Sequence, residues 1–178
     1  VLDIERGGLA DIRALYWQTD TSVSKNSWGH IANQDYKTVN SLIDDLVDIV
    51  SKNGCMLLNI GPTADGTIPE QEQQMLREIG AWLKQNGEAI YGTRPWIKFG
   101  EGSTKVSDGT MANDAERRRK DFNADDVRFT RHDDTVYATI LAWPGDRAAF
   151  TVRSFTPAAL PKGIKEVTML GAEGALRW

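Results

Sequence analysis

The stretch Asn59-Ile-Gly-Pro-Thr-Ala-Asp-Gly-Thr-Ile-Pro69 follows the apolar run Met56-Leu57-Leu58 and precedes an amphipathic pattern of helical period. We predict a buried strand over 56–60, then a loop bent by glycine and proline, then a helix. These elements form one βα unit whose loop lies at the carboxyl end of the strand. Parallel α/β barrels place their chemistry at this end, so the stretch favours that fold class.

Further strand and helix patterns lie on both sides of this unit. A helix is predicted over 38–52, where apolar residues recur at helical spacing after a cap at Thr38 or Asn40. A second helix is predicted over 69–86, with proline in its first turn. The apolar run 1–4 predicts another short strand. The alternation of strands and helices predicts the closing units of a parallel α/β fold.

The pattern changes beyond Trp96, where short runs alternate with period two, as is typical of strands in an antiparallel sandwich. The polar residues 100–121 are predicted to form a surface loop. We place a domain boundary near Arg94-Pro95, which divides the chain into an α/β unit, residues 1–95, and a β-sandwich, residues 96–178. The predicted sandwich strands lie at 127–130, 135–143, 148–152 and 166–170.

Composition and charge exclude several classes of protein. The 178 residues are 40% hydrophobic and 26% charged, an ordinary globular composition that argues against disorder. The net charge of −4 offers no basic surface for nucleic acid, and the basic run Arg117–Lys120 is surrounded by acidic residues. Apolar runs fall short of the roughly 18 residues that a membrane span needs. The single cysteine, Cys55, excludes an internal disulfide framework, and its apolar neighbours predict that it is buried.

The chain begins at Val1, without an initiator methionine, directly in a predicted strand, and it ends on Trp178. Domains usually end in polar, frayed segments. We therefore expect this chain to be an internal part of a longer protein, and the sequence does not determine its compartment.

Several motifs together resemble the α-L-fucosidases of glycoside hydrolase family 29, and specifically the C-terminal portion of their chain. The block Leu57–Gly66 is the most specific, and residues 167–171 and 175–178 resemble the distal part of the family's C-terminal sandwich. The other matching segments are Trp17–Thr21, Ser27–Gly29, Leu46–Gly54 and Gly87–Gly92.

The resemblance implies a retaining exo-glycosidase that removes terminal α-L-fucose from glycoconjugates or oligosaccharides. Residues 1–95 would then be the C-terminal part of the catalytic (β/α)8 barrel, and residues 96–178 a truncated C-terminal β-sandwich. The implied partners are a fucosylated glycan and the missing N-terminal barrel portion, with no cofactor, metal, nucleic acid or membrane, and a homo-oligomer stays open. The family usually acts in the periplasm, the extracellular space or the lysosome.

Retaining glycosidases need two carboxyl groups about 5–5.5 Å apart, a nucleophile and an acid/base. The family's nucleophilic Asp precedes the region that this chain matches, so the isolated 178-residue chain is expected to be inactive. Glu5 stands about two dozen residues before Trp28, which is the spacing of the family's acid/base. Asp20 is the fallback for this role. The non-catalytic alternative is that Glu5 forms an ion pair with Arg6 or Arg13 at the surface.

Aromatic residues complete the predicted site. By resemblance, Trp28 packs on the apolar face and methyl group of fucose, a contact that suits a flat apolar ring. Trp17 is a pocket wall or a core residue, and both tryptophans are candidate substrate-binding residues. Gln18 stands where many relatives have Glu, and an amide cannot serve as an acid.

Two other interpretations stay open. One is a non-catalytic carbohydrate-binding or accessory module derived from such an enzyme, which Gln18 and the missing N-terminal half of the barrel favour. The other is a retaining glycosidase of different specificity, such as a galactosidase on a related barrel.

Overall fold

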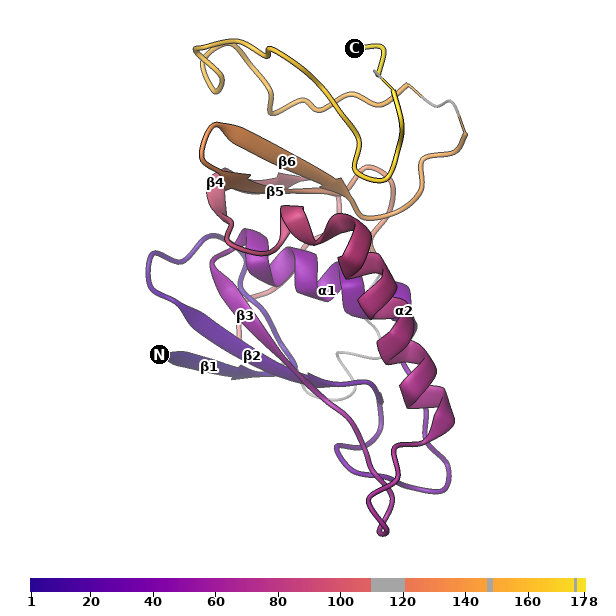
Figure 1. Ribbon diagram of the computed structural model, residues 1–178. Helices are drawn as coiled ribbons and strands as arrows, with labels where there is room; N and C mark the ends of the chain where they lie inside the picture. Colours follow the sequence, from indigo (N-terminus) through magenta and orange to yellow (C-terminus); the bar gives the residue numbers. More distant parts are fainter. Residues whose placement is uncertain (110–120, 147–148, 175) are drawn as a thin grey trace.

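The computed structural model describes residues 1–109, 121–146, 149–174 and 176–178 (Figure 1). Its first half contains a parallel sheet with the strand order β1-β2-β3. The registers set Glu5 opposite Asp20, and Asp20 opposite Leu57. The three strands are β1 (Leu2–Glu5), β2 (Trp17–Ser22) and β3 (Gly54–Asn59).

Helix α1 (Val39–Ser51) confirms the first predicted helix. The side chain of Thr38 caps it, because the Thr38 hydroxyl oxygen accepts a hydrogen bond from the Ser41 backbone N–H at 3.1 Å. Asn53, with a φ of 72°, turns the chain out of the helix. Only Lys52 and Asn53 separate the helix from β3, so α1 packs directly on the sheet.

Helix α2 (Glu70–Asn86) begins after Pro69 and confirms the second predicted helix. It continues into the short 3-10 helix η1 (Gly87–Ala89), which the sequence pattern does not predict. Its apolar face supplies Met75 and Ile79, which pack against Val23 and Leu42 in one buried cluster. This cluster joins α2 to α1 and to the segment that follows β2.

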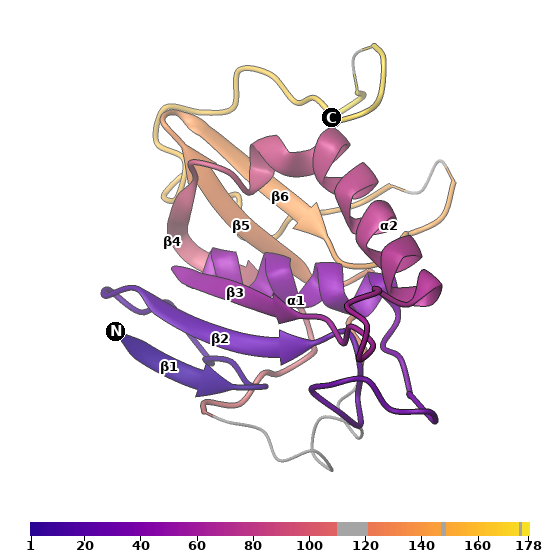
Figure 2. The same ribbon diagram turned by 60° about the horizontal axis from the view of Figure 1, so that its bottom comes forward.

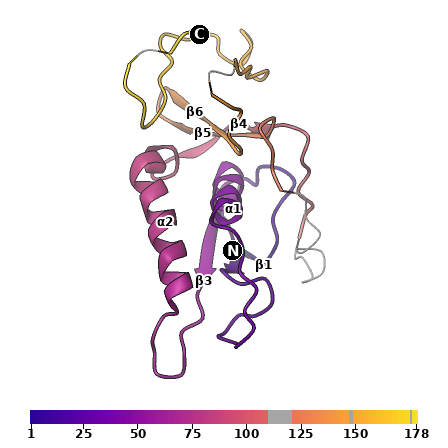
Figure 3. The same cartoon turned by 90° about the vertical axis from the view of Figure 1, so that its right-hand side faces the viewer.

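The second half contains an antiparallel sheet with the order β4-β5-β6. Trp96 contacts Phe129 and Phe155 edge to face, with ring centroids 5.3 and 5.5 Å apart. The strands are β4 (Arg94–Glu101), β5 (Val127–His132) and β6 (Thr135–Ile140). Helix α1 contacts both β4 and β5, so it lies between the two sheets (Figure 3).

The predicted sandwich is only partly formed. Residues 149–152 and 166–170 are not strands, and β6 ends at Ile140 rather than at Trp143. Phe150 and Val152 are still partly buried and pack against the cluster of Trp96 and Phe129. The alternating pattern at 149–152 therefore predicted which side chains pack on this cluster, whereas a strand also needs a partner edge for its backbone hydrogen bonds.

Two further expectations need correction. The sequence pattern predicts no strand at residues 17–22, yet they form β2, the central strand of the parallel sheet. Cys55 is exposed, because its side chain points away from the helices.

The basic run 117–120 and most of the predicted loop, from 110 to 120, lie outside the described residues. Among the residues that the structure describes, no helix is long and apolar enough to cross a membrane.

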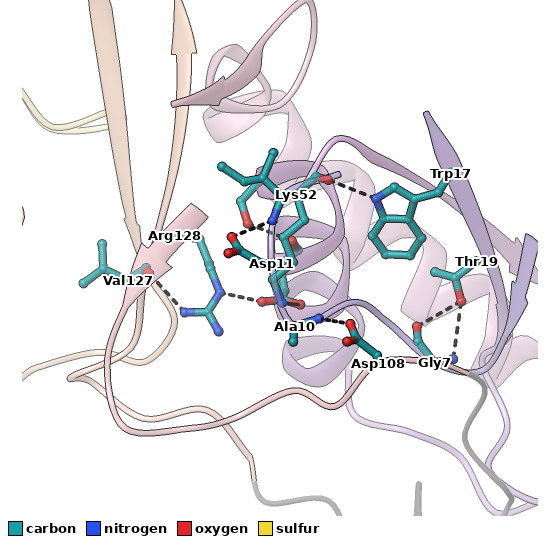
Figure 4. Close-up of polar contacts among 12 residues, drawn as sticks. Gly7, Ala10, Asp11, Trp17, Thr19, Lys52, Asp108, Val127 and Arg128 are labelled. Atoms are coloured by element: carbon teal, nitrogen blue, oxygen red, sulfur yellow. Dashed lines mark hydrogen bonds and ion pairs between the residues drawn. The ribbon is translucent and has the colours of Figure 1, made fainter. Parts of the chain in front are cut away.

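A buried group of charges joins α1 to the antiparallel sheet (Figure 4). Asp48 on α1 accepts a short hydrogen bond from Nε of Arg128 on β5, and its other oxygen accepts one from Nζ of Lys52 at 2.7 Å. All three side chains are buried. Burial lowers the pKa of Lys52, and the Asp48 carboxylate opposes that shift. Phe99 and Phe122 lie beside the Arg128 guanidinium, 5.3 and 4.9 Å from ring centroid to Cζ.

A second buried carboxylate, Asp126, accepts hydrogen bonds from two loop residues that precede β5. Thr104 donates to it from its backbone N–H at 2.9 Å and from its hydroxyl at 2.6 Å, and the Asn123 backbone N–H donates at 2.8 Å. Burial by itself would raise the pKa of Asp126, but these hydrogen bonds and the charge of Arg128 together lower it.

Replacing Asp48 by Asn should destabilise the protein by about 3–5 kcal/mol, because two buried cations lose their shared anion. Chemical denaturation at neutral pH measures this change. Asp35→Asn is the matched control, because Asp35 pairs with Lys25 at 3.4 Å with both side chains exposed, and it should cost about 0–1 kcal/mol. Equal losses in the two variants would contradict the structural role of Asp48.

Asp126→Asn should cost about 1–3 kcal/mol at neutral pH, because the donors around the carboxylate lose a charged acceptor. The pKa of Asp126 is lower in the folded state than its ordinary value of 3.8. The stability that the ionised carboxylate contributes is therefore present above pH 3.8 and is lost as the pH falls through the lower pKa of the folded state. Thermal unfolding of the wild type and the variant should therefore converge on acidification below about pH 4. Asp125→Asn, at an exposed neighbour, should show no such convergence.

Candidate active site

The two faces of the parallel sheet have different environments. Side chains alternate along a strand, so Ile4 on β1 and Trp17 and Thr19 on β2 point toward α1 and are buried. The opposite face, here called the open face, bears Asp3, Glu5, Gln18, Asp20, Cys55 and Leu57. Leu57 is 55% exposed, although it belongs to a predicted buried strand. The helices therefore cover one face of the sheet and leave the other accessible.

Carboxylates gather at the carboxyl end of the open face. Glu5 is the last residue of β1, it is exposed, and it lies in one row with Asp20 of β2 and Leu57 of β3. Asp20 is half-buried, and its Oδ1 is buried without a hydrogen-bond partner among the described residues. The predicted acid/base and its fallback are therefore neighbours on one face. This row can present carboxyl oxygens to a ligand at the strand ends.

Gln18 lies one row closer to the amino ends of the strands. It is opposite Asp3 in register, and its Nε2 donates to Asp3 Oδ1 at 3.5 Å. Gln18 therefore pairs with a carboxylate away from the row of Glu5 and Asp20.

The segment that carries Trp28 is held at the same end of the sheet by side chains from the ends of all three strands. Arg6, directly after β1, donates from Nη2 to the Ser27 carbonyl at 3.4 Å. Ser22, at the end of β2, donates to the same carbonyl at 3.1 Å. Asn59, at the end of β3, donates a short hydrogen bond to the Trp28 carbonyl. Trp28 is thereby fixed beside the carboxyl ends of the strands, where Figure 2 shows the loops after β2 and β3 gathered.

The loop after β3 packs against this segment. The Gly61 N–H donates to the buried carboxylate of Glu72 on α2 at 2.8 Å. A Cβ at Gly61 would lie only 3.0 Å from the backbone nitrogen of His30, so glycine permits the close approach. Tyr36 donates to the other oxygen of Glu72 at 3.4 Å, and burial and then this carboxylate raise the pKa of Tyr36. The loop after β3 therefore packs against the residues around Trp28 and supports their position.

Trp17 lies on the other side of the sheet from Glu5. It is 1% exposed and packs with Ile4 and Ile49, and its Nε1 donates to the Lys52 carbonyl at 3.0 Å (Figure 4). A Cβ at Gly54 would lie 2.5 Å from the Trp17 ring, so the indole packs directly on the backbone of β3. This geometry gives Trp17 a place in the core rather than on the open face that bears Glu5.

Sequence reasoning missed the roles of Arg6, Ser22 and Asn59. Asn59 stood in the signature stretch, but nothing in the local sequence indicated its contact with a residue 31 positions away. Among the described residues, no group of three or more His, Cys, Asp or Glu side chains could hold a metal ion.

The sequence matches models and members of a known protein family. Residues 2–88 match the family model for alpha-L-fucosidase, and residues 119–178 match the model for the alpha-L-fucosidase C-terminal domain. Tissue alpha-L-fucosidase of Rattus norvegicus is 36% identical over 165 residues, which cover 91% of this chain and 30% of the rat protein. Plasma alpha-L-fucosidase of Homo sapiens is 35% identical over 167 residues, which cover 91% of this chain and 31% of the human protein.

Solved structures agree with the sequence matches. An alpha-L-fucosidase structure superposes with a TM-score of 0.64 and 31% identity, and covers 80% of this chain and 29% of its own. The Thermotoga maritima alpha-fucosidase in complex with fucose gives a TM-score of 0.56 and 34% identity, over 72% of this chain and 26% of that chain. The chain thus spans about 30% of the length of the curated relatives it matches. On these matches to both family models, the chain belongs to the alpha-L-fucosidase family.

Proposed function

We propose that this chain supplies the acid/base carboxylate and one wall of the sugar pocket of a retaining α-L-fucosidase, whose nucleophilic Asp lies in a preceding segment. The observation that carries the proposal is the position of Glu5 at the carboxyl end of β1, on the open face, with the Trp28 segment held at the same end. The substrate is a terminal α-L-fucosyl group on a glycan, the class that the relatives' names indicate.

The fold supports this assignment. In the proposal, β1, β2 and β3 are closing strands of a (β/α)8 barrel, residues 1–95 belong to the catalytic domain and residues 96–178 to the C-terminal β domain. The strands are parallel and helices cover one face, as in a barrel wall, and the open face would line the barrel interior. The remaining strands would come from the preceding segment.

The chemistry follows from two carboxyl groups on opposite sides of the glycosidic bond. The preceding Asp attacks the anomeric carbon, and protonated Glu5 donates its proton to the departing glycosidic oxygen. The fucosyl-enzyme ester is then hydrolysed: Glu5, now ionised, takes a proton from water, and the water oxygen displaces the Asp carboxylate with a second inversion. The indole of Trp28 packs on the apolar face of the sugar.

Glu5→Gln in the full-length protein should lower kcat/KM about 10²–10⁴-fold on an α-L-fucoside with a poor leaving group, because protonation of the departing oxygen is lost. The loss should be much smaller on an activated dinitrophenyl fucoside, whose leaving group needs no proton. Steady-state kinetics on both substrates measure the difference. Asp3→Asn is the matched control on the same face of the same strand, and it should keep activity near that of the wild type.

The same assay separates the alternatives. If Asp20→Asn shows the dependence on leaving group and Glu5→Gln does not, the acid/base is Asp20. A full-length protein that binds fucose without hydrolysing any fucoside would instead be a binding module. Hydrolysis of galactosides but not of fucosides would indicate another specificity. Turnover by the isolated chain would contradict the placement of the nucleophile in a preceding segment.

Trp28→Ala should weaken inhibition of the full-length protein by free fucose about ten-fold or more, because the sugar loses its apolar contact. Inhibition constants measure this effect. Trp143→Ala removes an exposed tryptophan at the end of the antiparallel sheet and should leave fucose inhibition unchanged. Unchanged inhibition in Trp28→Ala would remove Trp28 from the pocket.

A further inference from the structure

Arg6, which directly follows Glu5, has an unusual conformation and environment. Its φ is 49°, a left-handed backbone conformation that non-glycine residues rarely adopt. Its side chain is nevertheless only 4% exposed. A buried cation on a strained backbone persists only where its surroundings hold it firmly, and such residues concentrate at functional sites.

The guanidinium of Arg6 binds the segment that leads to Trp28. Nη1 donates to the Ser24 carbonyl at 3.1 Å and to the Lys25 carbonyl at 3.4 Å, and Nη2 donates to the Ser27 carbonyl at 3.4 Å. Its Cζ lies 4.1 Å from the centroid of the Trp28 ring, within the range of a cation–π contact. One planar group therefore binds the backbone of this segment and contacts its aromatic ring.

Arg6 differs in this respect from the other side chains that hold the segment. Ser22 and Asn59 bind the carbonyls of Ser27 and Trp28, which position the backbone. Arg6 also contacts the indole ring, and so it restricts the orientation of the ring. Its own backbone N–H donates to the Asp20 carbonyl at 2.9 Å, which ties Arg6 to the row of Glu5 and Asp20.

We infer that Arg6 is a positioning residue that sets the plane of the Trp28 indole relative to Glu5. It thereby determines how strongly the site selects sugars that carry the C6 methyl group. The inference rests on the proposed function, in which Trp28 packs on fucose. The guanidinium occupies one face of the indole, and Trp28 is half-buried, which leaves part of the ring for a ligand. Lysine cannot replace Arg6, because an ammonium group lacks the planar fork that bridges several carbonyls and stacks on a ring.

The test compares two substrates of the full-length protein: an aryl α-L-fucoside and the aryl pentopyranoside that differs only in lacking the C6 methyl group. The ratio of their kcat/KM values measures selection for the methyl group. In Arg6→Lys this ratio should fall about ten-fold, mainly through a higher KM for the fucoside. Arg13→Lys is the matched control, because Arg13 also donates to loop carbonyls, those of Leu15 and Tyr16, but at the amino ends of the strands. Its ratio should not change.

Arg6→Gly provides a second variant, in which glycine adopts the left-handed backbone without strain and the guanidinium is lost. Its ratio should also fall, and millimolar methylguanidinium should restore part of it. A wild-type ratio in Arg6→Lys and Arg6→Gly, with the wild type active on fucosides, would overturn this inference alone. A wild type inactive on both substrates would overturn the proposed function and this inference with it.

Discussion

The buried carboxylate of Asp48 is the interaction on which the arrangement of the layers depends. It lies on α1, the helix between the two sheets, and it accepts hydrogen bonds from Arg128 of the antiparallel sheet and from Lys52 at the end of α1. Burying these charges costs desolvation free energy, which the shared anion and the surrounding hydrogen bonds offset only in this one geometry. The Lys52 carbonyl also accepts from Trp17, the residue that joins the central strand to the helix. One helix turn thus couples the core of the parallel sheet to the antiparallel sheet.

With α1 covering one face of the parallel sheet, alternation of side chains places Glu5 and Asp20 on the other face. Parallel strands all end at the same edge, so three residues distant in sequence meet there and bind a single segment. Arg6, Ser22 and Asn59 supply this binding, and none of them needs to touch a substrate to influence the site. In the proposed enzyme, the acid/base and the aromatic wall are therefore positioned by the same strand ends.

Local patterns predicted the helices well. The bounds of α1 and α2 agree with the cap at Thr38 and with Pro69, because these signals act within one helical turn. The strands were less predictable. The central strand β2 is rich in Thr and Ser, whose polarity concealed the alternation of Trp17, Thr19 and Thr21 toward α1. The predicted strand at 148–152 packs Phe150 and Val152 on the core without pairing, because an alternating pattern reports which side chains pack inward and not the presence of a neighbouring strand edge.

The sequence by itself determined the family, through the motif at residues 57–66. It also contains the spacing on which the prediction of Glu5 and Trp28 as site residues rests. Only the tertiary structure decided which face of each strand the helices cover. That choice buries Trp17 in the core, exposes Cys55 and directs Arg6 to Trp28 rather than to solvent. The physical reason is that a strand's two faces are equivalent in its local backbone geometry, and they become different only when another layer packs on one of them.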